Sequence, residues 1–176
     1  MRKIKFIVIA LLSIGIMSCS KSDKVSKEEK IIGAWKLESG NYNGTITAEG
    51  FPVPITFTAY LKDIDESNRL NFNEDHSFNS SLGSFTYVYE MDIFGTIHRE
   101  EIVFDNFFGE GTWEIEKDTL IMESPNAEVT WLYQIESLSS SALVISIDVQ
   151  SLLIEGSPPA GIEGADIRMN FSFSKR

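Results

Sequence analysis

Apolar and polar residues alternate with a period of two along most of the chain after residue 33. This period is typical of β-strands with one face against a core, because successive side chains of a strand point to opposite sides. Clusters of Gly, Asn, Asp and Ser separate the alternating segments and predict turns. The pattern predicts an antiparallel all-β domain of about eight to ten strands. The clearest strands are expected at 53–59, 85–93, 113–115, 129–135, 143–149 and 167–173.

One short helix is expected before the first strand. Ser26 and Glu29 have the spacing of a capping box, in which each side chain binds the backbone N–H of the other residue, and Ile31 and Ile32 follow directly. The spacing predicts one or two helical turns over roughly residues 26–32. No comparable signal follows, which leaves no helical crossovers for a parallel sheet.

The N-terminus has the organisation of a secretory signal. Three basic residues precede an apolar run that begins at Phe6 and ends near Met17. This run is shorter than the roughly 20 residues that a helix needs to cross a bilayer, so a cleaved signal is favoured over a permanent anchor. We expect a signal peptide over 1–18, a lipid-anchored tether over 19–27 and a barrel domain over 28–176.

The segment Ile16-Met17-Ser18-Cys19 resembles the lipobox of bacterial lipoproteins, in which the cysteine receives diacylglycerol and becomes the first residue after cleavage. Cys19 is the single cysteine of the chain and stands where the apolar run ends. The resemblance implies lipidation of Cys19 and an outer-membrane lipoprotein of the bacterial envelope, facing the periplasm or the cell exterior. The alternative is a plain secretory signal with an incidental cysteine.

Composition removes several classes of partner and cofactor. The chain has 26 acidic against 15 basic residues and a formal net charge of -11. Such an acidic body repels nucleic acid, so no nucleic-acid partner is expected. One cysteine excludes an intramolecular disulfide and any zinc or iron–sulfur site built from several cysteines. We expect a monomer without a cofactor.

The stretch from Lys30 to Leu37 is similar to the opening of a lipocalin, where a short helical turn leads into Gly-x-Trp at the start of the first strand. Here the motif is Gly33 and Trp35. The resemblance implies that Trp35 closes one end of an eight-stranded barrel and that a basic residue near the last strand stacks on it. The candidates for that basic residue are Arg168, Lys175 and Arg176.

Further segments fit the same family pattern, which extends over about residues 28–174. They are 70–78, 111–115, 120–122, and 133–138 with 143–145. Two regions, 41–61 and 87–108, contain more strand than a minimal eight-stranded barrel requires. They predict an additional hairpin or extended strands at one rim of a lipocalin-like (calycin) barrel.

The aromatic residues offer the best candidates for a binding site. The chain has 12 Phe, 5 Tyr and 3 Trp. One interpretation is that they fill the interior of the barrel, which is just wide enough for side chains. The other is that inward-facing aromatics line a cavity for a small hydrophobic ligand. The candidates for such a lining are Phe57, Phe72, Tyr87, Trp131 and Tyr133.

A calcium loop is a weaker alternative. Asp63, Asp65, Ser67 and Glu74 have the spacing of ligands 1, 3, 5 and 12 of a twelve-residue calcium loop, with Asn68 at the usual glycine position. The flanking segments lack a helical pattern, so an acidic turn between two strands explains the same residues. We therefore expect no metal site.

A hydrolase is the remaining hypothesis, because His98 stands near Glu100 and Glu101 and serines are plentiful. No serine has the glycine spacing of a nucleophile elbow, and neighbouring carboxylates of a strand point to opposite faces. We expect no catalytic residues and no enzymatic activity. The sequence thus favours a lipid-anchored lipocalin-like protein that binds a small hydrophobic ligand. The alternative is an envelope protein with a filled barrel whose rim binds a protein or a glycan.

Overall fold

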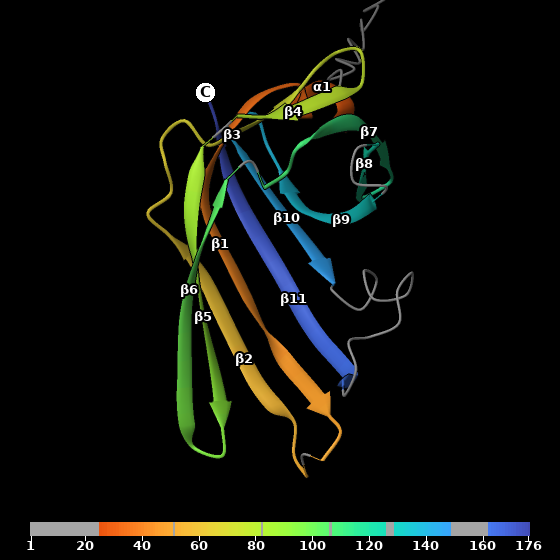
Figure 1. Cartoon of the computed structure of the whole chain (residues 1–176). Coiled ribbons are helices and arrows are strands. Elements are labelled where there is room, and N and C mark those ends of the chain that lie inside the picture. The colour runs from red at the N-terminus through yellow and green to blue at the C-terminus, as the bar shows by residue number, and fades with distance from the viewer. Residues whose placement is uncertain (1–24, 51, 82, 106, 126–128, 149–161) are drawn as a thin grey trace, which may run out of the picture.

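The computed structural model describes residues 25–50, 52–81, 83–105, 107–125, 129–148 and 162–176. The predicted signal peptide, Cys19 and most of the tether therefore lie outside the described residues. The described residues form one helix and eleven strands (Figure 1). These are α1 (Lys27–Ile31), β1 (Gly33–Ala48), β2 (Ile55–Lys62), β3 (Arg69–Phe72), β4 (Ser77–Ser80), β5 (Ser84–Ile93), β6 (Thr96–Asp105), β7 (Glu110–Glu116), β8 (Thr119–Ser124), β9 (Val129–Leu138), β10 (Ala142–Asp148) and β11 (Ile162–Lys175).

The predicted capping box forms at the start of α1. The backbone N–H of Glu29 donates to the Ser26 hydroxyl at 3.1 Å, and the N–H of Ser26 donates to the Glu29 carboxylate at the same distance. These two bonds satisfy N–H groups that the first helical turn cannot pair internally. The helix is short, and Ile31 at its end is buried in the barrel core.

Eight strands close into an antiparallel barrel. Around the barrel the strands follow each other in chain order as β1, β3, β4, β7, β8, β9, β10 and β11, and β11 pairs with β1 to complete the ring. Every pairing is antiparallel, for example Trp35 opposite Leu70 and Leu37 opposite Phe173. The predicted all-β antiparallel barrel is confirmed. Because the ring closes with strands from 33–175, it needs no residue of 1–24.

The other three strands continue the sheet beyond the barrel (Figure 1). Residues 33–36 of β1 pair with β3, whereas residues 41–46 of the same strand pair with β2, which is followed by β5 and then β6. We call β2, β5 and β6, with the parts of β1 and β11 beside them, the extension. The additional strands predicted from 41–61 and 87–108 are thus confirmed. They bring the total to eleven, above the predicted eight to ten.

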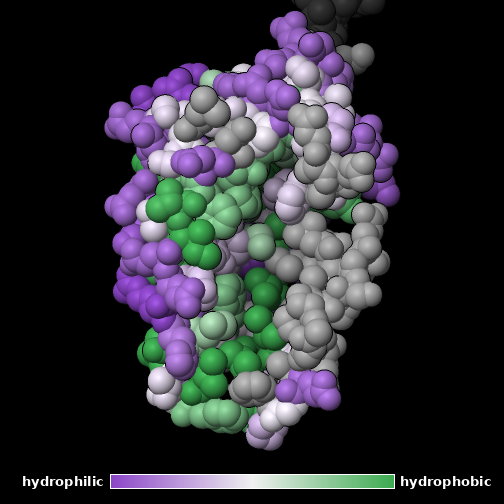
Figure 2. All heavy atoms as spheres, viewed as in Figure 1, coloured by the Kyte–Doolittle hydropathy of each residue, from purple (hydrophilic) through white to green (hydrophobic). Residues whose placement is uncertain are grey.

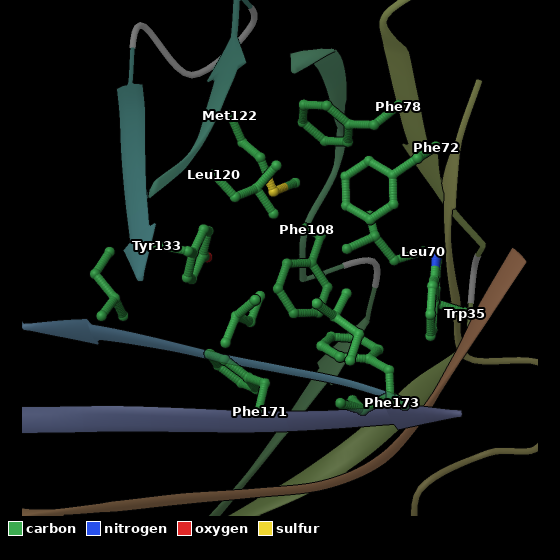
Figure 3. Packing of buried hydrophobic residues seen from close by; sticks show 14 of the residues in the cluster. Trp35, Leu70, Phe72, Phe78, Phe108, Leu120, Met122, Tyr133, Phe171 and Phe173 are labelled. Atoms are coloured by element: carbon green, nitrogen blue, oxygen red, sulfur yellow. The ribbon is translucent and has the colours of Figure 1, made fainter. Parts of the chain in front are cut away.

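The core occupies the barrel interior, where side chains from facing strands meet (Figure 3). The pairing registers place one inward residue of each strand opposite an inward residue of the next, such as Trp113 opposite Met122 and Met122 opposite Trp131. This period-two inward face is the one that the alternation of the sequence predicts. Among the described residues, no helix is long and apolar enough to cross a membrane.

Candidate functional site

One end of the barrel is closed around Trp35. Its side chain is fully buried, and the indole Nε1–H donates to the Ile31 carbonyl at 2.5 Å. This bond ties the first strand of the barrel to the end of α1. Lys27 holds the same helix to the turn between β7 and β8, donating to the Lys117 carbonyl at 2.6 Å and pairing with Asp118.

The basic residue that stacks on Trp35 is Lys175. Its ammonium lies 5.1 Å from the centre of the indole ring and also donates to the Lys30 carbonyl at 2.7 Å. Gly33 has φ +126°, and a Cβ there would lie 2.9 Å from Cε of Lys175, so glycine serves both the backbone conformation and the close approach. Arg168, another of the sequence candidates, instead pairs with Glu136 on the outer surface.

The interior next to this closed end is filled with large side chains. Figure 3 shows Phe72 of β3, Phe78 of β4, Phe171 and Phe173 of β11, and Phe108 from the turn between β6 and β7, all reaching toward a common centre. All of these rings are buried. The ring centres of Phe108 and Phe171 are 5.4 Å apart, and those of Phe108 and Phe173 are 5.8 Å apart, both ordinary aromatic packing distances. This part of the barrel is therefore a packed core.

A continuous row of aromatic rings leads from this core onto the inward face of the extension. Successive ring centres along the row are 6.4, 6.4, 5.8, 4.9, 5.9 and 6.1 Å apart. We call this set the aromatic row; in order from the barrel it consists of Trp131, Tyr133, Phe171, Tyr42, Tyr87, Tyr89 and Phe57. The row thus connects four of the five predicted ligand residues.

The outer half of the row lies on a partly open apolar face. Phe57, Tyr87, Tyr89 and Met169 are half-buried, and Ile102 on the neighbouring strand is 42% exposed. Figure 2 shows hydrophobic residues gathered along the hollowed side of the molecule that the extension forms. We call these five residues the apolar face.

The fifth predicted ligand residue, Phe72, lies elsewhere. Its ring centre is 5.6 Å from that of Trp113, and its side chain is buried between β1 and β4 near the closed end. The row also contains residues that the sequence did not single out as ligand candidates. Tyr89 and Phe171 stand on predicted inward faces, whereas Tyr42 is surrounded by Gly40, Asn41, Asn43 and Gly44, where no alternation marks an inward position.

The acidic segment between β2 and β3 does not form a twelve-residue calcium loop. The Asp65 carboxylate accepts a hydrogen bond from the backbone N–H of Ser67 at 2.7 Å. Hydrogen bonds from the side chain and the backbone of Ser67 hold the pKa of Asp65 below its usual range. Residues 69–72 then form β3, and this extended strand leads Glu74 away from Asp63. Among the residues that the structure describes, no three His, Cys, Asp or Glu side chains are grouped so as to hold a metal ion.

The two histidines occupy unrelated places. His76 lies in the turn between β3 and β4, as predicted, with its ring 4.8 Å from that of Trp113. It borders a surface pocket of about 360 Å³ on the outside of β7 and β8. A second surface pocket of about 380 Å³ lies over β9 and β10, beside Arg168. His98 is exposed on β6, opposite Met91.

A closed eight-stranded antiparallel barrel, preceded by a short helix and sealed by a buried tryptophan, defines a calycin-type barrel protein. Residues 31–145, more than half of the chain, match the family model described as lipocalin-like domain. The chain therefore belongs to the lipocalin-like domain family. Neither the comparison with curated proteins nor that with solved structures gives a match.

Proposed function

We propose that this protein is a lipid-anchored lipocalin-like protein of the bacterial envelope that binds a small hydrophobic molecule without chemically changing it. The observation that carries the proposal is the aromatic row, which begins at the half-buried Phe57 and continues ring by ring to Tyr133 in the barrel. An apolar ligand lying along the outer half of this row loses contact with water and gains contact with rings that already have fixed neighbours.

The packed interior limits where the ligand binds. Because large side chains fill the barrel around Phe108, the ligand site lies on the apolar face rather than deep in the barrel. Burial of each ligand methylene contributes about 0.8 kcal/mol, so a chain of about ten carbons supplies enough to offset the cost of association. The site requires no movement of the core.

The predicted lipid on Cys19 would hold the binding face close to a membrane, which is where hydrophobic molecules concentrate. Expression of the full chain in a bacterial host, followed by partition between a detergent phase and water, tests this anchor. We expect the full chain in the detergent phase and the Cys19→Ser variant in the aqueous phase. A full chain that remains aqueous would contradict lipid anchoring and leave only the secretory signal.

Ligand binding is tested with a chain that begins at Ser20, since the barrel closes without residues 1–24. Native mass spectrometry of the purified chain reports co-purified molecules. Titration with the uncharged fluorophore N-phenyl-1-naphthylamine reports binding directly. We expect Phe57→Ala to weaken binding of this fluorophore about tenfold, because a few aromatic side chains carry most of the binding energy of such a surface. Leu132→Ala, which removes an exposed side chain from the outer face of the barrel, is the matched control.

A wild-type chain that neither carries an adduct nor binds the fluorophore would refute the ligand-binding proposal. Equal affinity of wild type, Phe57→Ala and Leu132→Ala would instead place the ligand away from the apolar face. Circular dichroism of each variant checks that the fold is retained.

One observation favours binding of a partner through the rim as the second candidate function. β6 ends the order of strands and pairs on one side only among the described strands, with β5. On its outer face Ile97 and Val103 are 68% and 66% exposed. An open strand edge with exposed apolar side chains is a surface to which an extended peptide segment of a partner can add. Substitution of Ile97 with Lys would abolish such binding and leave fluorophore binding unchanged.

A further inference from the structure

Three tyrosines meet where the barrel joins the extension. Tyr42 is 4% exposed and Tyr133 is 2% exposed, whereas Tyr87 is half-buried. The rings of Tyr42 and Tyr87 are 4.9 Å apart at nearly a right angle, and Tyr42 and Tyr133 both pack against Phe171, at 5.8 and 6.4 Å. Figure 3 shows Tyr133 reaching from β9 toward the side of the core where Phe171 lies. We call Tyr42, Tyr87 and Tyr133 the tyrosine cluster.

The hydroxyls of the tyrosine cluster form no hydrogen bond with any residue that the structure describes. Among the described residues, the buried polar side-chain atom that lacks a partner is Nε of Arg69, so the three hydroxyl oxygens are not sealed from solvent. Tyrosine hydroxyls in such places usually find a hydrogen-bond partner. Tyr89, the next ring of the row, follows that rule, since its hydroxyl donates to the Glu100 carboxylate at 2.5 Å. Three neighbouring hydroxyls that bond no described residue are therefore available to donate to an oxygen acceptor on a ligand.

All three hydroxyls are neutral donors at physiological pH. Burial raises the pKa of Tyr42 far above its ordinary value, and the nearby Tyr87 and Tyr133 phenols raise it further. Burial likewise raises the pKa of Tyr133, and it raises the pKa of Tyr87 to about 12. A neutral phenol offers one O–H, so the cluster presents three donors.

The charges near the cluster disfavour an anionic ligand. The basic side chains of the extension, Lys62 and Arg99, lie on the face opposite the apolar face. There they pair with Glu101, at 2.8 and 3.1 Å. On the inward side of β6 the ionisable groups are Glu100 and His98. His98 is exposed, and Glu100 lies between it and the barrel. A ligand carboxylate at the cluster would meet no described cation and would face the Glu100 carboxylate.

We propose that the tyrosine cluster selects an uncharged amphiphile, an alcohol, ketone or ester with a long apolar chain, whose oxygen accepts hydrogen bonds from these hydroxyls while the chain lies on the apolar face. This inference rests on the proposed ligand-binding function and gives its ligand class. Free fatty acids of the same chain length are then poor ligands, because ionised carboxylates lose their hydration without gaining a cation.

The experiment compares three ligands of similar chain length as competitors of N-phenyl-1-naphthylamine at pH 8: 1-decanol, methyl decanoate and ionised decanoate. We expect the alcohol and the ester to displace the fluorophore at concentrations at least about tenfold lower than decanoate does. Tyr42→Phe and Tyr133→Phe each remove one hydroxyl and keep the ring. Each should raise the half-displacing concentration of 1-decanol about fivefold to tenfold, the effect of one hydrogen bond. The affinity for the fluorophore itself should change less than about twofold, because it brings no oxygen acceptor.

Tyr60→Phe is the matched control, because Tyr60 is exposed on the outer face of β2 and its hydroxyl accepts a hydrogen bond from Arg99. It should behave as wild type with all ligands. If decanoate competes as well as 1-decanol, or if the Tyr→Phe variants leave 1-decanol unaffected while the fluorophore still binds, the inference is wrong and ligand binding stands. If the wild-type chain binds neither the fluorophore nor any competitor, the proposed function and the inference fail together.

Discussion

The closed end of the barrel is built around the Trp35 ring and its two polar contacts, with the Ile31 carbonyl and the Lys175 ammonium. The contribution of these contacts to the free energy of unfolding can be measured. Trp35→Phe keeps an aromatic ring but removes the N–H that donates to the Ile31 carbonyl. Lys175→Met keeps most of the aliphatic stem but removes the ammonium above the ring and its bond to the Lys30 carbonyl. The two single variants and the double variant form a cycle that measures the coupling between the residues.

The expected magnitudes follow from burial. Trp35 is fully buried, so Trp35→Phe leaves the Ile31 carbonyl without this donor, at a cost of about 1–3 kcal/mol. The smaller ring also leaves a void that costs roughly 1 kcal/mol. Lys175→Met should cost about 1–3 kcal/mol through the lost cation–π contact and hydrogen bond. Since phenylalanine is a weaker cation–π partner for Lys175 than the indole, we expect a coupling energy of about 0.5–2 kcal/mol.

Urea unfolding of the chain from Ser20, followed by circular dichroism, provides the free energies. With a slope of about 2 kcal/mol per molar urea, Trp35→Phe should lower the midpoint by about 1–2 M while the slope stays unchanged. Leu132→Ala on the exposed outer face should change stability by less than about 0.5 kcal/mol. A loss below 1 kcal/mol for Trp35→Phe, or a coupling energy of zero, would refute the role assigned to the closed end.

Three further outcomes are expected. Gly111→Ala should prevent stable folding, because its Cβ would lie 1.8 Å from the Glu123 carbonyl oxygen; a melting temperature near that of wild type would contradict this. Glu136→Gln should destabilise the protein at pH 7, because a hydrogen bond from Ser146, followed in size by a nearby guanidinium, lowers the pKa of Glu136 in the folded state. That difference should shrink as the pH falls below 4.5, since the unfolded chain then binds a proton at Glu136 that the folded protein takes up only at lower pH, and a difference independent of pH between 2 and 7 would refute it. Burial raises the pKa of Tyr133, so stability should fall as the pH rises above 10, and Tyr133→Phe should reduce that fall in urea titrations.

Much of the fold could be predicted because sequence patterns between neighbouring residues determine many of its elements. The capping box around Ser26 and the alternation in segments such as 143–149 depend only on neighbouring residues, and both predicted elements form. Local patterns are weaker at the ends of strands. Val53 continues an alternating pattern, yet it is 53% exposed and β2 begins at Ile55. Hydrophobic alternation alone does not decide where a strand finds a partner.

The candidate site was less predictable, because it depends on which strands become neighbours. Phe72 and Phe57 both have inward positions, but β3 pairs within the barrel whereas β2 pairs in the extension. The two rings therefore have different surroundings, one packed and one partly open. Tyr42 was missed because its importance comes from contacts with Tyr87 and Phe171, which are distant in sequence. Likewise, the pairing register between β1 and β11 decides which basic residue stacks on Trp35. It places Lys175 opposite Trp35 and Arg168 opposite Asn43.

β1 and β11 each run as one strand from the barrel into the extension, over 16 and 14 residues, and they stay paired across a register shift between Leu37 and Ser39. At about 3.3 Å per residue, β1 is roughly 50 Å long, about three times the length of a typical strand. The backbone therefore has no hinge between the proposed ligand face and the core, and the face cannot act as a flap that swings open. Binding there should stabilise the whole molecule in one cooperative melting transition, so that a thermal shift of the entire fold reports occupancy.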